Sequence, residues 1–169
     1  LSILYFYFDN HQASFVPLIY VVISLFSALY LYKTKNFIVF ESLQLAMILF
    51  LPFLLMWILG GFGASSFVFI WAFYATVAAA MYSEKLKVEI VWFSAFLILL
   101  FISALIDSSL IENVTNNFPI QILDIFFFFN IGAGLGGIYF LISHFINNIK
   151  KISKELKRDR ESLYLITND

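Results

Sequence analysis

Residues 120–161 read IQILDIFFFFNIGAGLGGIYFLISHFINNIKKISKELKRDRE, the most informative segment of the chain. Its first part is apolar enough for a membrane, whereas its last part is rich in Lys, Arg, Asp and Glu. No Pro or Gly follows Gly137, so nothing in the sequence forces a helix to break between the two parts. The stretch therefore predicts one long helix that leaves a bilayer and continues in water.

One apolar stripe runs along this predicted helix in alternating steps of four and three residues, the heptad spacing of a coiled coil. In a parallel dimer, Glu155 and Arg160 would face each other with opposite charge. Asp159 interrupts the stripe. A buried unpaired carboxylate would destabilise the dimer. Asp159 therefore fixes the register of the two helices, marks a weak point that can switch, or lies where the two helices splay apart. The predicted dimer seam consists of Ile149, Ile152, Leu156, Asp159, Leu163 and Ile166. We expect a membrane domain over residues 1–148 and a cytoplasmic coiled-coil linker over residues 149–169.

The composition is that of a membrane protein. The chain is 62% hydrophobic and 12% charged, whereas soluble domains are about 45–50% apolar and about 25% charged. With no Cys, a disulfide or a thiolate metal site is excluded. The lipid bilayer is thus the first expected partner, and nothing indicates nucleic acid.

The basic residues predict which loops are cytoplasmic. All ten Lys and Arg fall at Lys33 and Lys35, at Lys85 and Lys87, or in residues 150–160. Cytoplasmic loops carry an excess of Lys and Arg, so these three places lie inside the cell.

This charge pattern and the hydropathy together predict an all-α, polytopic bundle with five full spans and the remnant of a sixth. Residues 1–8 are too short to span and are interpreted as the outer end of a helix that starts upstream. With that helix restored, both termini of the domain would be cytoplasmic. The five spans are residues 15–32, 37–59, 67–82 (starting a few residues before Phe67), 88–106, and a last helix that begins near Ile120. Residues 60–66 form a tight outer turn, and residues 107–119 form a longer outer loop without a cation.

Polar and small residues inside the spans are the candidates for packing or sensing. Asn130 is the deepest strongly polar residue of the last helix, and an intramembrane Asn bonds to neighbouring helices. Glycines allow helices to approach closely, and Pro52 removes one backbone hydrogen bond and would kink its helix. The glycines of this predicted contact are Gly132, Gly134, Gly136 and Gly137. Ordinary bundle packing is the alternative interpretation.

Three acidic residues lie near the predicted outer loop: Asp107, Glu112 and Asp124. Together with Asn130 they are the candidate ligand-binding residues, as an acidic mouth for a cation or a polar ligand; solvated helix ends are the alternative. At the other membrane face lies the lysine cluster, which we define as Lys150, Lys151, Lys154 and Lys157. Its expected role is binding to anionic lipid headgroups. The sequence contains no catalytic triad, phosphate loop or metal-ligand cluster.

Three stretches resemble the N-terminal six-helix membrane domain of bacterial class III adenylate and guanylate cyclases. They are residues 43–62 (LQLAMILFLPFLLMWILGGF) with Ala64-Ser-Ser66 and Ile70-Trp-Ala72; Trp92-Phe-Ser-Ala-Phe96 with Leu105-Ile-Asp107; and Phe129-Asn-Ile-Gly132. The resemblance implies a bacterial inner-membrane protein whose cytoplasmic cyclase domain works as a homodimer with two divalent metals, Mg or Mn. It carries over no catalytic residue and no cofactor to this chain.

Several functions remain open from the sequence. The first is a membrane anchor and sensor that passes a signal from an unknown ligand to a nucleotidyl cyclase domain. The same module could serve a histidine kinase or a diguanylate cyclase instead. A small transporter or channel is an alternative of another class, although the scarcity of polar groups in the middle of the spans argues against it.

Overall fold

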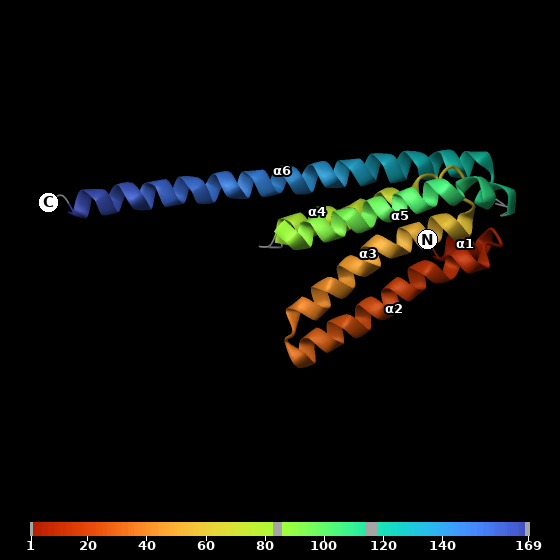
Figure 1. The fold of residues 1–169 in the computed structure, drawn as a ribbon, viewed down its shortest axis with the longest axis horizontal. Coiled ribbons are helices and arrows are strands. Elements are labelled where there is room, and N and C mark those ends of the chain that lie inside the picture. The colour runs from red at the N-terminus through yellow and green to blue at the C-terminus, as the bar shows by residue number, and fades with distance from the viewer. Residues whose placement is uncertain (1, 83–85, 114–117, 168–169) are drawn as a thin grey trace. The chain divides into compact units, whose positions relative to one another are not determined.

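The computed structural model of the chain describes residues 2–82, 86–113 and 118–167. All regular elements within these residues are helices, which confirms the expected all-α fold (Figure 1). In chain order they are α1 (Ser2–Tyr7), α2 (His11–Thr34), α3 (Phe37–Leu59), the 3₁₀-helix η1 (Val68–Ala72), α4 (Phe73–Tyr82), α5 (Leu86–Asn113) and α6 (Ile120–Thr167). Lys85 of the expected second inner loop and residues 114–117 of the expected outer loop lie outside the described residues.

The chain divides into two compact units. The first, Leu1–Leu135, contains α1 to α5, η1 and the N-terminal part of α6, and the second, Gly136–Asp169, contains the rest of α6. The division therefore falls inside one helix, which continues without interruption from Ile120 to Thr167.

Four helices among the described residues are long and apolar enough to cross a membrane, whereas we expected five full spans. They comprise residues His11–Thr34, Phe37–Leu59, Leu86–Glu112 and Ile120–Glu161, with mean hydropathies between 1.9 and 2.4. A helix needs about 20 apolar residues to span the hydrocarbon core, and these four meet that length. The chain is thus built to be embedded in a membrane.

The remaining apolar segment, Val68–Met81, is shorter than a usual span. We expected its helix to start before Phe67, and this is wrong. Ser66 and Phe67 adopt left-handed backbone conformations with φ of 53° and 58°, which a right-handed helix cannot contain. The helix begins only at Val68 and its first five residues are 3₁₀. At about 2.0 and 1.5 Å per residue, η1 and α4 together measure roughly 25 Å, somewhat less than the about 30 Å of a hydrocarbon core.

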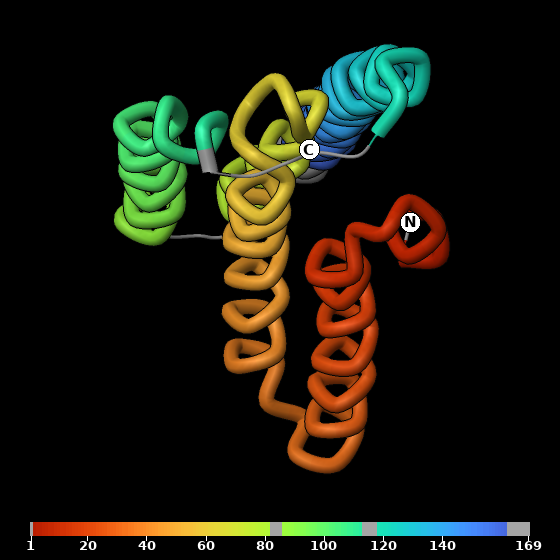
Figure 2. The backbone as a smooth tube through the Cα atoms, turned by 90° about the vertical axis from the view of Figure 1, so that its right-hand side faces the viewer, coloured from red at the N-terminus to blue at the C-terminus, as the bar shows by residue number. Residues whose placement is uncertain are grey.

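α2 and α3 form an antiparallel pair joined by a short turn (Figure 2). Lys35 ends α2 in the left-handed conformation, and its N–H donates to the Leu31 carbonyl. Asn36 then caps α3 by accepting a hydrogen bond from the Val39 N–H at 3.3 Å, the usual role of an N-cap Asn. Between the helices, the Gln44 amide bridges Ser24 and Ser27 of α2, donating to the Ser27 hydroxyl at 2.6 Å.

The core of the first unit lies around the middle of α3. Leu49, Phe53 and Met56 are fully buried. The Phe53 ring packs against Phe69 of η1 and Phe96 of α5, with ring centroids 6.0 and 5.7 Å apart. Such offset and tilted ring pairs stabilise beyond the area they bury, by about 0.5–1.5 kcal/mol each. α3 is therefore the central helix, against which α2, η1, α4 and α5 all pack.

Two helices extend into segments that we expected to be loops. α2 begins at His11, and α5 continues to Asn113, so Asp107 lies in a helix and not in the outer loop. Residues 108–113 include no Gly or Pro to end the helix, and Leu110 and Ile111 continue its apolar character. Pro52 does not interrupt α3, which is assigned as one helix from Phe37 to Leu59.

Candidate functional site

Asn130 is the centre of a polar network in the apolar interior of the first unit. Its side chain is 9% exposed. The amide nitrogen donates to the Ser66 carbonyl at 2.9 Å, and the amide oxygen accepts from the Trp71 indole N–H at 3.0 Å. The Ser66 hydroxyl in turn donates to the Leu123 carbonyl of α6 at 2.9 Å. Asn130 and Ser66 thus tie α6 to the segment that leads into η1.

Gly134 lies one turn further along α6, where the helix comes close to η1. A Cβ added at Gly134 would lie 2.9 Å from Cγ2 of Ile70, too close for an ordinary contact. The Tyr74 hydroxyl donates to the Gly134 carbonyl at 3.0 Å, so a polar contact accompanies the close approach. Gly132 has no such neighbour among the described residues, and Gly136 and Gly137 belong to the second unit. Gly134 is therefore the one predicted glycine for which the described residues of the first unit show a close contact.

Asp107 of α5 supports the loop between α3 and η1. Its carboxylate accepts a hydrogen bond from the Phe62 N–H at 2.9 Å. Gly61 precedes this contact with a φ of 99°, and a Cβ on Gly61 would collide with the Asp107 carboxylate. Asp107 and Asn130 both bind non-helical backbone of residues 60–67, through the Phe62 N–H and the Ser66 carbonyl. The segment is therefore a loop held by α5 and α6, a more elaborate structure than the tight turn we expected.

The other two candidate acids lie on the surface. Glu112 and Asp124 are exposed, in contrast to Asp107, whose carboxylate is engaged with the Phe62 N–H. Among the residues that the structure describes, no three His, Cys, Asp or Glu side chains are grouped so that they could hold a metal ion.

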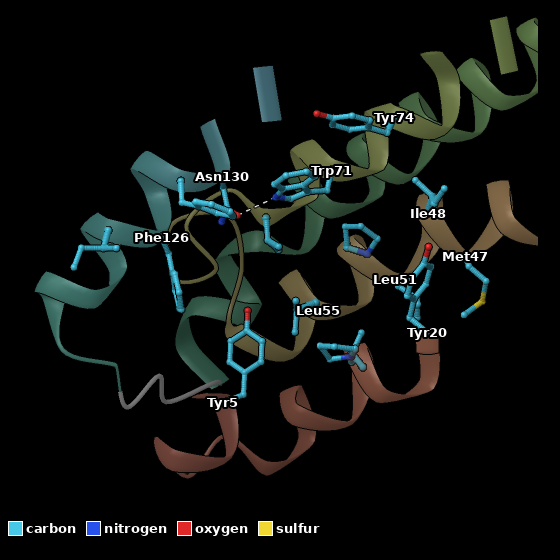
Figure 3. Close-up of a pocket in the computed structure, with 16 residues that line it drawn as sticks. Tyr5, Tyr20, Met47, Ile48, Leu51, Leu55, Trp71, Tyr74, Phe126 and Asn130 are labelled. Atoms are coloured by element: carbon cyan, nitrogen blue, oxygen red, sulfur yellow. Dashed lines mark hydrogen bonds between the residues drawn. The ribbon is translucent and has the colours of Figure 1, made fainter. Parts of the chain in front are cut away.

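A cavity of about 790 Å³, open on one side, is formed in the first unit by residues of α1, α2, α3, η1, α4 and the N-terminal part of α6 (Figure 3). Its walls are apolar except for Asn130, the Trp71 indole and three tyrosines. Pro52 is part of the wall contributed by α3. Ligand sites are typically apolar hollows of about 300–1,000 Å³ with a few placed polar groups, and this cavity has both properties. Asn130 thus belongs at once to the polar network and to the cavity wall.

The second unit carries the predicted seam and the lysine cluster. Ile149, Ile152 and Leu156 are 49, 55 and 64% exposed, although they are large apolar residues. The side chains of Leu163 and Ile166 lie outside the described residues, while their backbone is helical. The seam residue Asp159 and all four residues of the lysine cluster are exposed on the same helix.

Sequence reasoning identified Asn130 but missed its partners. Four residues of the network or the cavity were not predicted as site residues. They are Ser66 with its carbonyl, Trp71 with its indole, and Tyr74 and Tyr5 with their hydroxyls. The available signal was the polar atom that each aromatic side chain carries into an apolar segment, where Tyr and Trp usually find a partner. No family model, curated protein or solved structure matches this chain.

Proposed function

We propose that this chain is the membrane anchor and sensor region of a dimeric bacterial signalling protein. In this proposal η1 and α4 complete a fifth span, the basic loops are cytoplasmic, and α6 passes a signal to a nucleotidyl cyclase domain that follows in the full-length protein. The cyclase assignment is supported by the resemblance of residues 43–62, 64–66, 70–72, 92–96, 105–107 and 129–132 to such membrane domains. A histidine kinase or diguanylate cyclase output is the second form of the same proposal.

The observation that carries the proposal is the continuity of α6. The helix has the buried Asn130 near its apolar end and the charged residues 150–161 near its other end, with no break from Ile120 to Thr167. Suppose that α6 can take two positions, and that a ligand binds more tightly to the packing around Asn130 in one of them. Binding of the ligand would then favour that position of α6. Because an α-helix is stiff over this length, a shift or rotation at Asn130 would also move the charged part.

The exposed apolar residues of the second unit support pairing of two chains. Ile149, Ile152 and Leu156 lie among charged residues, and each is about half exposed in the single chain. Burying apolar surface is worth about 25 cal/mol per Å², and a second copy of the same helix offers a matching stripe. The result would be a parallel coiled coil formed by the α6 helices of two chains, beyond the point where each helix leaves the membrane.

Cysteine crosslinking tests the pairing directly, because the chain has no Cys of its own. Single cysteines at Ile149, Ile152 or Leu156 should form crosslinked dimers in membranes, since seam residues of a parallel dimer face each other. Cysteines at Lys150 and Lys154 are the matched controls, as they lie on the same turns but off the seam. Equal crosslinking at all five positions would contradict the parallel coiled coil.

A further inference from the structure

Tyr5, a mostly buried residue, points its hydroxyl into the cavity of the first unit. Tyr5 is only 3% exposed, and its ring packs edge-on against Phe118 with centroids 5.8 Å apart. Figure 3 shows its hydroxyl pointing from α1 into the cavity, toward the side where Trp71 and Asn130 lie. Within the described residues nothing hydrogen-bonds to this hydroxyl. A Tyr hydroxyl in apolar surroundings usually finds a hydrogen-bond partner, so the Tyr5 hydroxyl is available to a ligand that enters the cavity.

Asn130 has bonding capacity left on the same cavity wall. An Asn amide has two N–H donors and an oxygen that accepts two hydrogen bonds. In the structure one donor is used by the Ser66 carbonyl and one acceptor position by the Trp71 indole. One N–H and one acceptor position therefore remain for a further group. The cavity can accordingly both donate to and accept from a ligand, through Tyr5 and Asn130.

The rest of the lining determines which ligand chemistry fits. Among the described residues that line the cavity, none is Lys, Arg, His, Asp or Glu. A charged group buried in such surroundings would have no counter-charge, which is very costly in an apolar medium. The walls are otherwise aliphatic and aromatic, with Leu51 and Leu55 from α3 and Phe126 and Phe129 from α6 among them. The site thus suits a hydrocarbon chain with one small, neutral hydrogen-bonding group.

We propose that this cavity binds a neutral single-chain amphiphile, whose hydroxyl or carbonyl group bonds to Tyr5 and Asn130 while its hydrocarbon chain lies along α3 and α6. Binding of the amphiphile does not depend on the proposed function, but its role as the signal does. The ligand reaches Asn130, the residue that ties α6 to the segment before η1. Binding would therefore act on the contact that positions the long helix.

Fluorescence quenching measures binding at this site. In a Trp57→Phe/Trp92→Phe protein in nanodiscs, Trp71 of the cavity wall is the remaining tryptophan, and bromine quenches it on contact. The probes are ω-bromoundecanol and ω-bromoundecanoic acid, which share one chain and differ in the head group, and a phosphatidylcholine with a brominated acyl chain. At about pH 8 the acid is ionised. We expect saturable quenching by the alcohol, at least tenfold weaker binding of the carboxylate, and no saturable quenching by the phospholipid.

Two tyrosine variants separate the hydroxyl from the fold. Tyr5→Phe keeps the ring contacts with Phe118 and Phe126 and should weaken binding of the alcohol about fivefold, the effect of one lost hydrogen bond. Tyr7→Phe is the matched control, because Tyr7 lies on the same helix and is 79% exposed; it should bind as the parent does. Crosslinking at Ile149 is measured on the same samples, so a failure of ligand binding is distinguished from a failure of helix pairing.

Three outcomes would overturn the inference. Equal binding of the alcohol and the carboxylate would remove the requirement for a neutral ligand. Equal binding by the parent and Tyr5→Phe proteins would remove the tyrosine from the site. If the brominated phospholipid quenches Trp71 strongly and added alcohol does not reduce this quenching, ordinary bilayer lipid fills the cavity.

Discussion

Replacing Asn130 with Leu removes two of the hydrogen bonds that hold α6 to residues 66–71 and leaves the one between Ser66 and Leu123. Leu is close to Asn in size, so the main change is the loss of the two polar contacts, at 2.9 and 3.0 Å. Hydrogen bonds between helices in a bilayer contribute about 0.6 kcal/mol on average and at most about 1.7 kcal/mol. Leu gains little in return, because lipid is as apolar as the protein interior. We therefore expect Asn130→Leu to lower the free energy of unfolding by about 1–3 kcal/mol.

The assay is unfolding by SDS in mixed micelles, followed by thiol labelling of a single cysteine. Ala79 is fully buried in α4, and Ala79→Cys places the label where only unfolded protein reacts. Trp71→Phe completes a double-mutant cycle with Asn130→Leu and isolates the bond between the two side chains. That cycle should give a coupling of about 0.6–1.7 kcal/mol.

A control and a refuting result complete the design. Asn148 is exposed and its only described hydrogen bond is to His144, one turn away. Asn148→Leu should change the free energy of unfolding by less than about 0.5 kcal/mol, as surface substitutions usually do. A coupling between Asn130 and Trp71 within the about 0.3–0.5 kcal/mol expected of independent sites would refute the reasoning, because the two side chains would then not be bonded.

Three other expectations can be measured in the same protein. Gly134→Ala should destabilise the first unit by about 1–3 kcal/mol, the usual cost of overpacking. Adding Ile70→Ala in the same chain should restore part of the lost stability. If SDS unfolding shows that the two substitutions have additive effects, the close contact between Gly134 and Ile70 is contradicted. Asp107→Ala should cost about 1.5–3 kcal/mol, because the half-buried Phe62 N–H loses a charged acceptor. Asp124→Ala should cost less than about 0.5 kcal/mol; equal losses would exclude a special role for Asp107. Amide hydrogen exchange of residues 150–157 should be slower in nanodiscs of anionic lipid than of zwitterionic lipid, and changing the whole lysine cluster to Gln should remove that difference; if the difference persists, the lysines do not bind the headgroups.

Hydropathy and helix-breaking residues predicted the long helices well. The apolar lengths of α2, α3, α5 and α6 follow directly from composition, and α6 is continuous because no Pro or Gly interrupts its charged part. Asn130 was also predictable as a contact, since a strongly polar side chain inside a span needs a partner. These features depend on local sequence alone.

The loop before η1 and the cavity could not be predicted in the same way. Ser66 and Phe67 are left-handed although neither is Gly, a conformation that few residues of these types adopt. The partners of Asn130 are a backbone carbonyl and an indole about 60 residues earlier in the chain, at sequence separations of 64 and 59. Tyr5 reaches the cavity only because α1 packs beside α2 and α6, an arrangement that periodicity does not reveal.

The loop of residues 60–67 also has a consequence for the order in which the protein assembles. Its Phe62 N–H and Ser66 carbonyl are satisfied by Asp107 and Asn130, which are synthesised 45 and 64 residues later, respectively. Until α5 and α6 have been synthesised, these two backbone groups lack the partners that they have in the folded chain. The hydrogen bonds that hold this loop therefore form late, after the last helix has been made.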